Sequence, residues 1–327
     1  MSTSLMFRSG TSSGKWFALL LLSALTFETG CNRSRGMSER EMVMSLVLQS
    51  KFETVAYVRS PVLASWKSNS SWKPESDLEA PFGPFLYALD RLGLDVRKQA
   101  VGGSMAVLLG AYDFRGPQGP PPSLGPVESK ACALFLMPGG VPGVLLKALD
   151  ARASPRINEE WSWEVEQERR PSKKMWATIG APDALVLCNY VQGTGQVLAD
   201  LVKASVRETV LHNEYLRSRM ARGEYWMVRQ VRHSGVDRTA AALNDIDSEV
   251  ETIALLPGSR KGTCELVTLS KNKKESPFRA LESKGLIPVA VQKNPGTWVT
   301  EIELSSEPKD PDAMFGARYL LGFGTYL

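Results

Sequence analysis

Two apolar runs of strand length constrain the fold of this chain most. Residues 104–114 (SMAVLLGAYDF) and 131–137 (ACALFLM) are separated by residues 115–126, which are rich in proline and glycine. Because proline and glycine mark turns and loops, we interpret the runs as antiparallel strands joined by a long loop. The sequence therefore predicts a body built on β-structure.

A third stretch has the two-residue period of a half-buried strand. Residues 161–168 (WSWEVEQE) place Trp161 and Trp163 on one side of an extended chain. Glu164 and Glu166 fall on the other side, because successive side chains of a strand point to opposite faces. We expect the tryptophans to be buried and the glutamates to form a solvated outer face.

The remaining periodicity predicts further strands and several helices. Strand-like runs cover residues 52–58, 175–179, 184–190, 225–231, 250–256, 263–269, 298–304 and 319–327. Helical spacing covers residues 85–92, 141–151, 192–206, 237–246 and 277–283, and another helix begins near Ser38. In the 141–151 helix we expect one face to be directed to the core, formed by Val141, Val144, Leu145 and Leu149. The fold class predicted is α+β, with antiparallel sheets and helices packed on one face.

The order of these elements divides the chain into four parts. Residues 1–30 are expected to be a signal peptide, residues 31–37 a polar tether, and residues 38–207 and 208–327 two α+β subdomains. Each of the last two parts offers a hairpin, a helix and then a further strand. We interpret them as an internal structural repeat with little residue-by-residue identity.

The N-terminal leader carries the signature of export. A positively charged start with Arg8 and Lys15 precedes an apolar run from Trp16 to Phe27. The run is too short to cross a bilayer, which needs roughly 20 apolar residues. Charge, an apolar run and then small residues form the pattern of a secretory signal.

The end of the leader resembles the signal peptide of bacterial lipoproteins. Thr29 and Gly30 are small residues placed before Cys31, whereas Glu28 stands where that family usually has an apolar residue. The resemblance covers residues 15–31 and implies that Cys31 is lipidated and becomes the mature N-terminus. Two alternatives stay open: an ordinary cleaved signal followed by an incidental cysteine, and an uncleaved signal anchor.

Three further cysteines lie in strand-like runs, at Cys132, Cys188 and Cys264. Buried thiols of this kind act as small apolar groups. In an exported protein one pair could oxidise, but spacing does not choose which pair. Because the sequence contains no Cys-x-x-Cys motif and no Cys/His cluster, we expect no metal site.

Two glycine-rich turns partly match nucleotide-binding motifs, but each lacks a feature that the motif requires. Gly193-Thr-Gly195 precedes a predicted helix, but Leu198 occupies the third glycine position of a dinucleotide fingerprint. Gly258-Ser-Arg-Lys-Gly262 lacks the spacing of a phosphate loop, so we interpret it as a hairpin turn. We expect no cofactor.

The sequence contains no recognisable catalytic constellation. His212 and His233, its only histidines, are expected on the surface. The net charge of +4 gives no case for nucleic acid as a partner.

We therefore expect an exported, lipid-anchored protein of the bacterial cell envelope, held at the membrane through Cys31. Its expected role is non-enzymatic, in binding an envelope protein or in structure. The alternative is an exported hydrolase that uses carboxylates drawn from Glu164, Glu166 and Asp183.

Overall fold

The computed structural model describes residues 43–44, 52–66, 79, 81–99, 103–110, 130–157, 160–167, 170–180, 183–190, 193–206, 213–230, 249–260, 262–283, 285 and 287–303. The leader, the tether with Cys31, both histidines, the helix expected at 237–246 and the strand expected at 319–327 lie outside the described residues.

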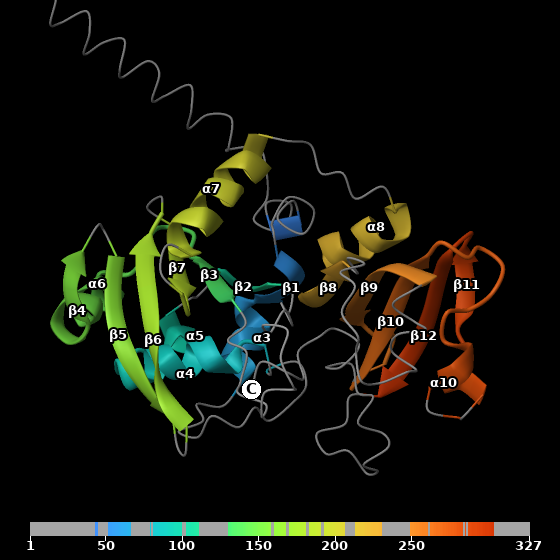
Figure 1. Ribbon diagram of the computed structural model, residues 1–327, viewed down its shortest axis with the longest axis horizontal. Coiled ribbons are helices and arrows are strands. Elements are labelled where there is room, and N and C mark those ends of the chain that lie inside the picture. The colour runs from blue at the N-terminus through green and yellow to red at the C-terminus, as the bar shows by residue number, and fades with distance from the viewer. Residues whose placement is uncertain are drawn as a thin grey trace, which may run out of the picture.

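In the part of the chain that the structure describes, twelve strands form one antiparallel sheet. They are β1 (Phe52–Arg59), β2 (Ser104–Gly110), β3 (Ala131–Leu136), β4 (Ser154–Ile157), β5 (Glu160–Gln167), β6 (Arg170–Ile179), β7 (Ala184–Cys188), β8 (Tyr225–Gln230), β9 (Val250–Pro257), β10 (Thr263–Ser270), β11 (Val291–Asn294) and β12 (Thr297–Glu303). Their order across the sheet is β11-β12-β10-β9-β8-β1-β2-β3-β7-β6-β5-β4, and every neighbouring pair is antiparallel. The sheet dominates the structure, and the helices pack on it (Figure 1).

Most predicted strands are confirmed. The two apolar runs that opened the sequence analysis become β2 and β3, which pair with each other. The alternating stretch becomes β5, in which Trp161 and Trp163 are buried and Glu164 and Glu166 are exposed. Each indole also finds an acceptor: Trp161 Nε1 donates to Asp150 at 2.9 Å, and Trp163 Nε1 to a backbone carbonyl at 3.3 Å. The four-residue strands β4 and β11 were not predicted, because four residues show too little alternation.

Helices cover both faces of the sheet, so the expectation of helices on one face is wrong. The described helices are α3 (Ser60–Ser65), α4 (Gly83–Arg91), α5 (Val96–Gln99), α6 (Gly143–Arg152), α7 (Gly193–Val206), α8 (Glu214–Arg222) and α10 (Arg279–Ser283). One apolar cluster joins Leu63 of α3 and Leu89 of α4 to Phe135 of β3. A separate cluster joins Val197 of α7 and Leu216 of α8 to the opposite side of the strands. Figure 1 shows α7 and α8 above the sheet and α3, α4 and α5 below it.

The central strands explain why both faces need cover. All six residues of β3 are buried; Ala133 and Phe135 belong to one cluster, and Cys132 and Leu134 to the other. Burial of apolar area stabilises the fold by about 25 cal/mol per Å2. A strand that is apolar on both sides therefore gains from a helix layer on each. The uninterrupted apolar sequence of residues 131–137 is the pattern expected of a strand that is buried on both faces.

The predicted helix at 141–151 begins later and faces differently. In α6, Leu145 and Leu149 are fully buried, as residues four apart on one helix face should be. Val144 is 55% exposed, so its predicted place in the core is wrong. The reason is geometric, because Val144 lies about 100° around the helix from Leu145.

One strand pair joins the two predicted subdomains. β1 of the 38–207 segment pairs with β8 of the 208–327 segment, and the Tyr57 and Trp226 rings stack with centroids 5.1 Å apart. Arg59 and Glu224 add an ion pair of 3.0 Å at the end of this seam. Among the described strands, both segments contain a three-strand meander followed by a helix and returning strands, and the first segment has two returning strands more. The internal repeat itself stays a prediction.

Candidate functional site

The carboxylates of the hydrolase alternative do not form a site. Glu164 and Glu166 lie on the solvated side of β5, and Asp183 is exposed at the start of β7. Glu164 is in register with Lys174 of β6, whereas Asp183 follows the far end of β6. A rise of about 3.3 Å per residue puts roughly 20 Å of strand between these two positions. The structure therefore does not bring Asp183 together with the glutamates.

The glycine turn at 193–195 serves packing. A Cβ on Gly193 would lie 2.6 Å from the Tyr190 ring and 2.9 Å from Cβ of Cys188, so the close approach requires glycine. Thr194 is fully buried, and its hydroxyl donates to Glu160 Oε1. The turn thus attaches the start of α7 to the sheet. Close packing explains the glycine at position 193.

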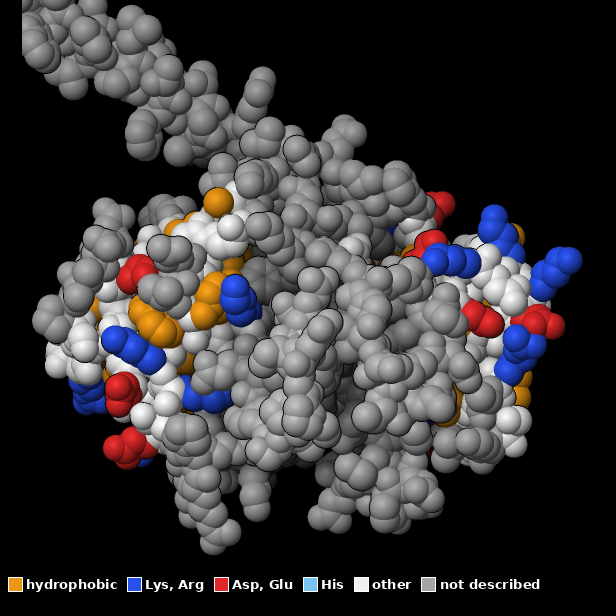
Figure 2. Space-filling model, in the orientation of Figure 1, with side chains coloured by type: hydrophobic (Ala, Val, Ile, Leu, Met, Phe, Trp, Pro, Cys, Tyr) orange, Lys and Arg blue, Asp and Glu red, His pale blue; other side chains and the backbone are white. Residues whose placement is uncertain are grey.

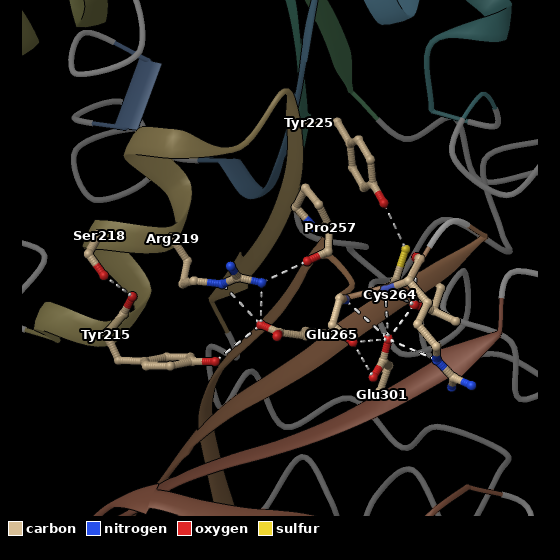
Figure 3. Close-up of polar contacts among 11 residues, drawn as sticks. Tyr215, Ser218, Arg219, Tyr225, Pro257, Cys264, Glu265 and Glu301 are labelled. Carbon is tan, nitrogen blue, oxygen red and sulfur yellow. Dashed lines mark hydrogen bonds and ion pairs between the residues drawn. The ribbon is translucent and has the colours of Figure 1, made fainter.

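The densest polar network among the described residues lies where β9, β10, β12 and α8 meet (Figure 3). It has two parts, each centred on one carboxylate. Glu265 of β10 and Glu301 of β12 are register partners across the two strands. Both side chains lie on the same face of the sheet but have different partners: Glu265 contacts α8, and Glu301 contacts the β9–β10 turn (Figure 3).

The β9–β10 turn holds the Glu301 carboxylate in the way that a loop holds an anion. Backbone N–H groups of Ser259 and Arg260 donate to Oε1 at 3.1 and 3.3 Å. The Ser259 hydroxyl lies 2.9 Å from both carboxylate oxygens, and the Thr263 hydroxyl donates to Oε1. These hydrogen bonds, first those of Thr263 and Ser259, lower the pKa of Glu301 to about 2. The turn at 258–262 is confirmed as a hairpin turn, and the anion that it holds is a side chain of the same protein.

The Glu265 carboxylate is engaged from α8. Tyr215 Oη donates to it at 3.1 Å, and Arg219 lies 2.8 Å from the same oxygen. Arg219 also donates to the carbonyl of Pro257 at 2.8 Å, which ties α8 to the end of β9. Burial, followed by the charge of Glu265, raises the pKa of Tyr215.

Both carboxylates are therefore used for structure. Glu301 binds backbone and hydroxyl groups of its own chain, and Glu265 binds a hydroxyl and a guanidinium group through Oε2. Sequence reasoning missed the network. Its signal was an acidic residue inside a largely apolar strand: Glu265 in TCELVTLS, and Glu301, followed by Glu303, in TWVTEIE.

The cysteine pairing left open by the sequence is resolved. Cys132 of β3 and Cys188 of β7 are register partners and form a disulfide. Both are fully buried. Cys264 is buried too and forms no disulfide, and its Sγ lies 3.2 Å from the Tyr225 hydroxyl. Burial and this contact raise the pKa of Tyr225.

Within the described ranges, no group of three or more His, Cys, Asp or Glu side chains is arranged to hold a metal ion. Among the helices formed by the same residues, none combines the length and apolar character needed to span a bilayer.

Comparison with known proteins gives no family. No protein-family model matches the chain, and no curated protein matches it. Crystal structures of TP0453 are similar in outline. Form I has a TM-score of 0.43 at 9% identity over 87% of this chain and 98% of that one. Form III has a TM-score of 0.40 at 10% identity over 82% and 95%. Scores at this level support no conclusion about function.

Proposed function

We propose that this protein is exported to the bacterial cell envelope, is anchored to a membrane by a lipid on Cys31, and has a non-enzymatic binding or structural role there. The export signal and the small residues before Cys31 support the first two parts.

The observation that carries the proposal is the Cys132–Cys188 disulfide. Disulfides persist in oxidising compartments such as the periplasm and are rare in the reducing cytosol. This one joins two central strands of the sheet and is closed off from solvent. A disulfide built into the core agrees with a chain that folds after export, which the leader indicates independently.

The non-enzymatic part rests on how the acidic residues are used. Glu265 and Glu301 are held by internal donors. The three carboxylates proposed for hydrolysis are all exposed, and Asp183 lies apart from Glu164 and Glu166. A hydrolase needs at least one acid and one base facing a common space. The described residues favour a role in binding or structure.

The test is the chemistry of the mature N-terminus. The full chain is expressed in a bacterial host in the presence of labelled palmitate and recovered from the membrane fraction. We expect an acylated chain that begins at Cys31, and we expect Cys31→Ala to take up no label. Cys264→Ala is the matched control and should label like the parent. Recovery of unacylated protein that retains Met1 in the cytosol would contradict the proposal.

A further inference from the structure

One edge of the sheet is open and apolar. β11 is the last strand in the sheet order and pairs only with β12 among the described strands. All four of its residues are exposed. Among the described residues the exposed large apolar side chains are three valines, and two belong to this edge: Val289 at 75% and Val291 at 57%.

The two edges of the sheet differ in how they are protected. Strand β4, at the opposite edge, contains Pro155, which removes a backbone donor and discourages pairing with another strand. β11 contains no proline, and each of its residues keeps a backbone N–H and C=O. On an edge strand every second residue directs these groups away from the sheet, where another strand can bind them.

Lysines surround this open edge. Lys293 is part of β11, and Lys271, Lys273 and Lys274 lie on the segment after β10; all four are exposed. The segment is attached to β11, because Gln292 Nε2 donates to the carbonyl of Lys273 at 2.6 Å. Lys and Arg side chains project at the end of the molecule where Figure 1 places β11, with a few acidic ones among them (Figure 2). Glu275, the acidic residue of this segment, is paired with Arg279.

We propose that β11 is a docking edge that takes an extended, acidic segment of another protein as an additional strand. This inference rests on the proposed binding role and names the class of partner. Main-chain hydrogen bonds to β11 would supply affinity, and Val289 and Val291 would contact apolar side chains of the added strand. The lysines select acidic residues. They also disfavour a second copy of this chain, because two copies meeting here would bring two lysine clusters together.

The test uses the purified full-length chain in detergent and fluorescent synthetic peptides of about six residues. The first peptide alternates Glu and Val, the second alternates Lys and Val, and the third is the Glu/Val peptide with alternate backbone nitrogens methylated. We expect saturable binding of the first peptide only, weakened by added salt. Equal binding of the Glu and Lys peptides, equal binding of the methylated peptide, or no binding of the Glu peptide would overturn the inference.

Variants localise the binding. Val291→Ser and Lys293→Glu should each weaken binding of the Glu/Val peptide at least about fivefold, since an exposed apolar contact or a charge pair contributes on the order of 1 kcal/mol. Val144→Ser is the matched control, because Val144 is 55% exposed on α6 and should leave binding unchanged. A dimer in sedimentation that Val291→Ser dissociates would show that the occupant is a second copy, against the proposal. Failure of these assays leaves the acylation result at Cys31 untouched, so the two proposals fail separately.

Discussion

Removing the Cys132–Cys188 disulfide should destabilise the protein far more than removing the other buried cysteine. The two residues are 56 apart in sequence. Closing a loop of that length in the unfolded chain costs about 14 cal/mol/K of entropy, so the cross-link stabilises the native state by about 4 kcal/mol at 25 °C. The variant Cys132→Ala/Cys188→Ala should lose this amount plus the packing energy of two buried sulfurs.

Guanidinium unfolding followed by intrinsic tryptophan fluorescence measures the effect. Cys264→Ala is the matched control, because it removes one equally buried sulfur and closes no loop. The double variant should also unfold with a steeper dependence on denaturant, since its unfolded state exposes more surface. If the double variant loses no more than twice the free energy lost by Cys264→Ala, the loop-closure reasoning is wrong. Thiol titration of the denatured parent should change on reduction, and an unchanged count would refute the disulfide itself.

Three further predictions concern polar contacts. The pKa of Glu301 is lowered from 4.5 to about 2, so its carboxylate stabilises the fold fully above pH 4.5. The stability difference between wild type and Glu301→Gln, measured by unfolding at several pH values, should therefore shrink as the pH falls toward 2, and a constant difference would contradict this. Asn213 caps α8 by accepting from the Leu216 N–H at 2.9 Å, so Asn213→Ala should cost about 1 kcal/mol in unfolding free energy and Asn213→Ser much less. Arg97 is buried and bonded to two aspartates at 2.7 and 2.9 Å, so Arg97→Ala should cost about 3 kcal/mol, against less than about 0.5 for the exposed Arg91→Ala.

Local sequence patterns predicted the strands well because each pattern reports how one strand is buried. Alternation in 161–168 predicted which side chains of β5 are buried, and the apolar run at 131–137 predicted β3. Gly93 and Gly285, which follow α4 and α10, adopt the positive φ that favours glycine after a helix. These features depend on neighbours within a few residues, which a sequence displays directly.

The arrangement of these elements was beyond local patterns. Helices on both faces, the Cys132–Cys188 pairing and the partnership of Glu265 with Glu301 all depend on which strands become neighbours. The prediction of the candidate site was the least accurate, because the acidic residues chosen from the sequence are exposed to solvent. A carboxylate inside a largely apolar strand was the better indicator, since a partly buried charge requires internal partners.

The seam between β1 and β8 has a consequence for biosynthesis. β1 emerges early, yet Arg59 and Glu224, which meet at the end of the seam, are 165 residues apart. A chain synthesised from its N-terminus must grow to more than half its length before β1 gains its second neighbour. Until then Val55 and Tyr57 lack the Trp226 strand beside them. During that interval the open side of β1 is available for binding by chaperones.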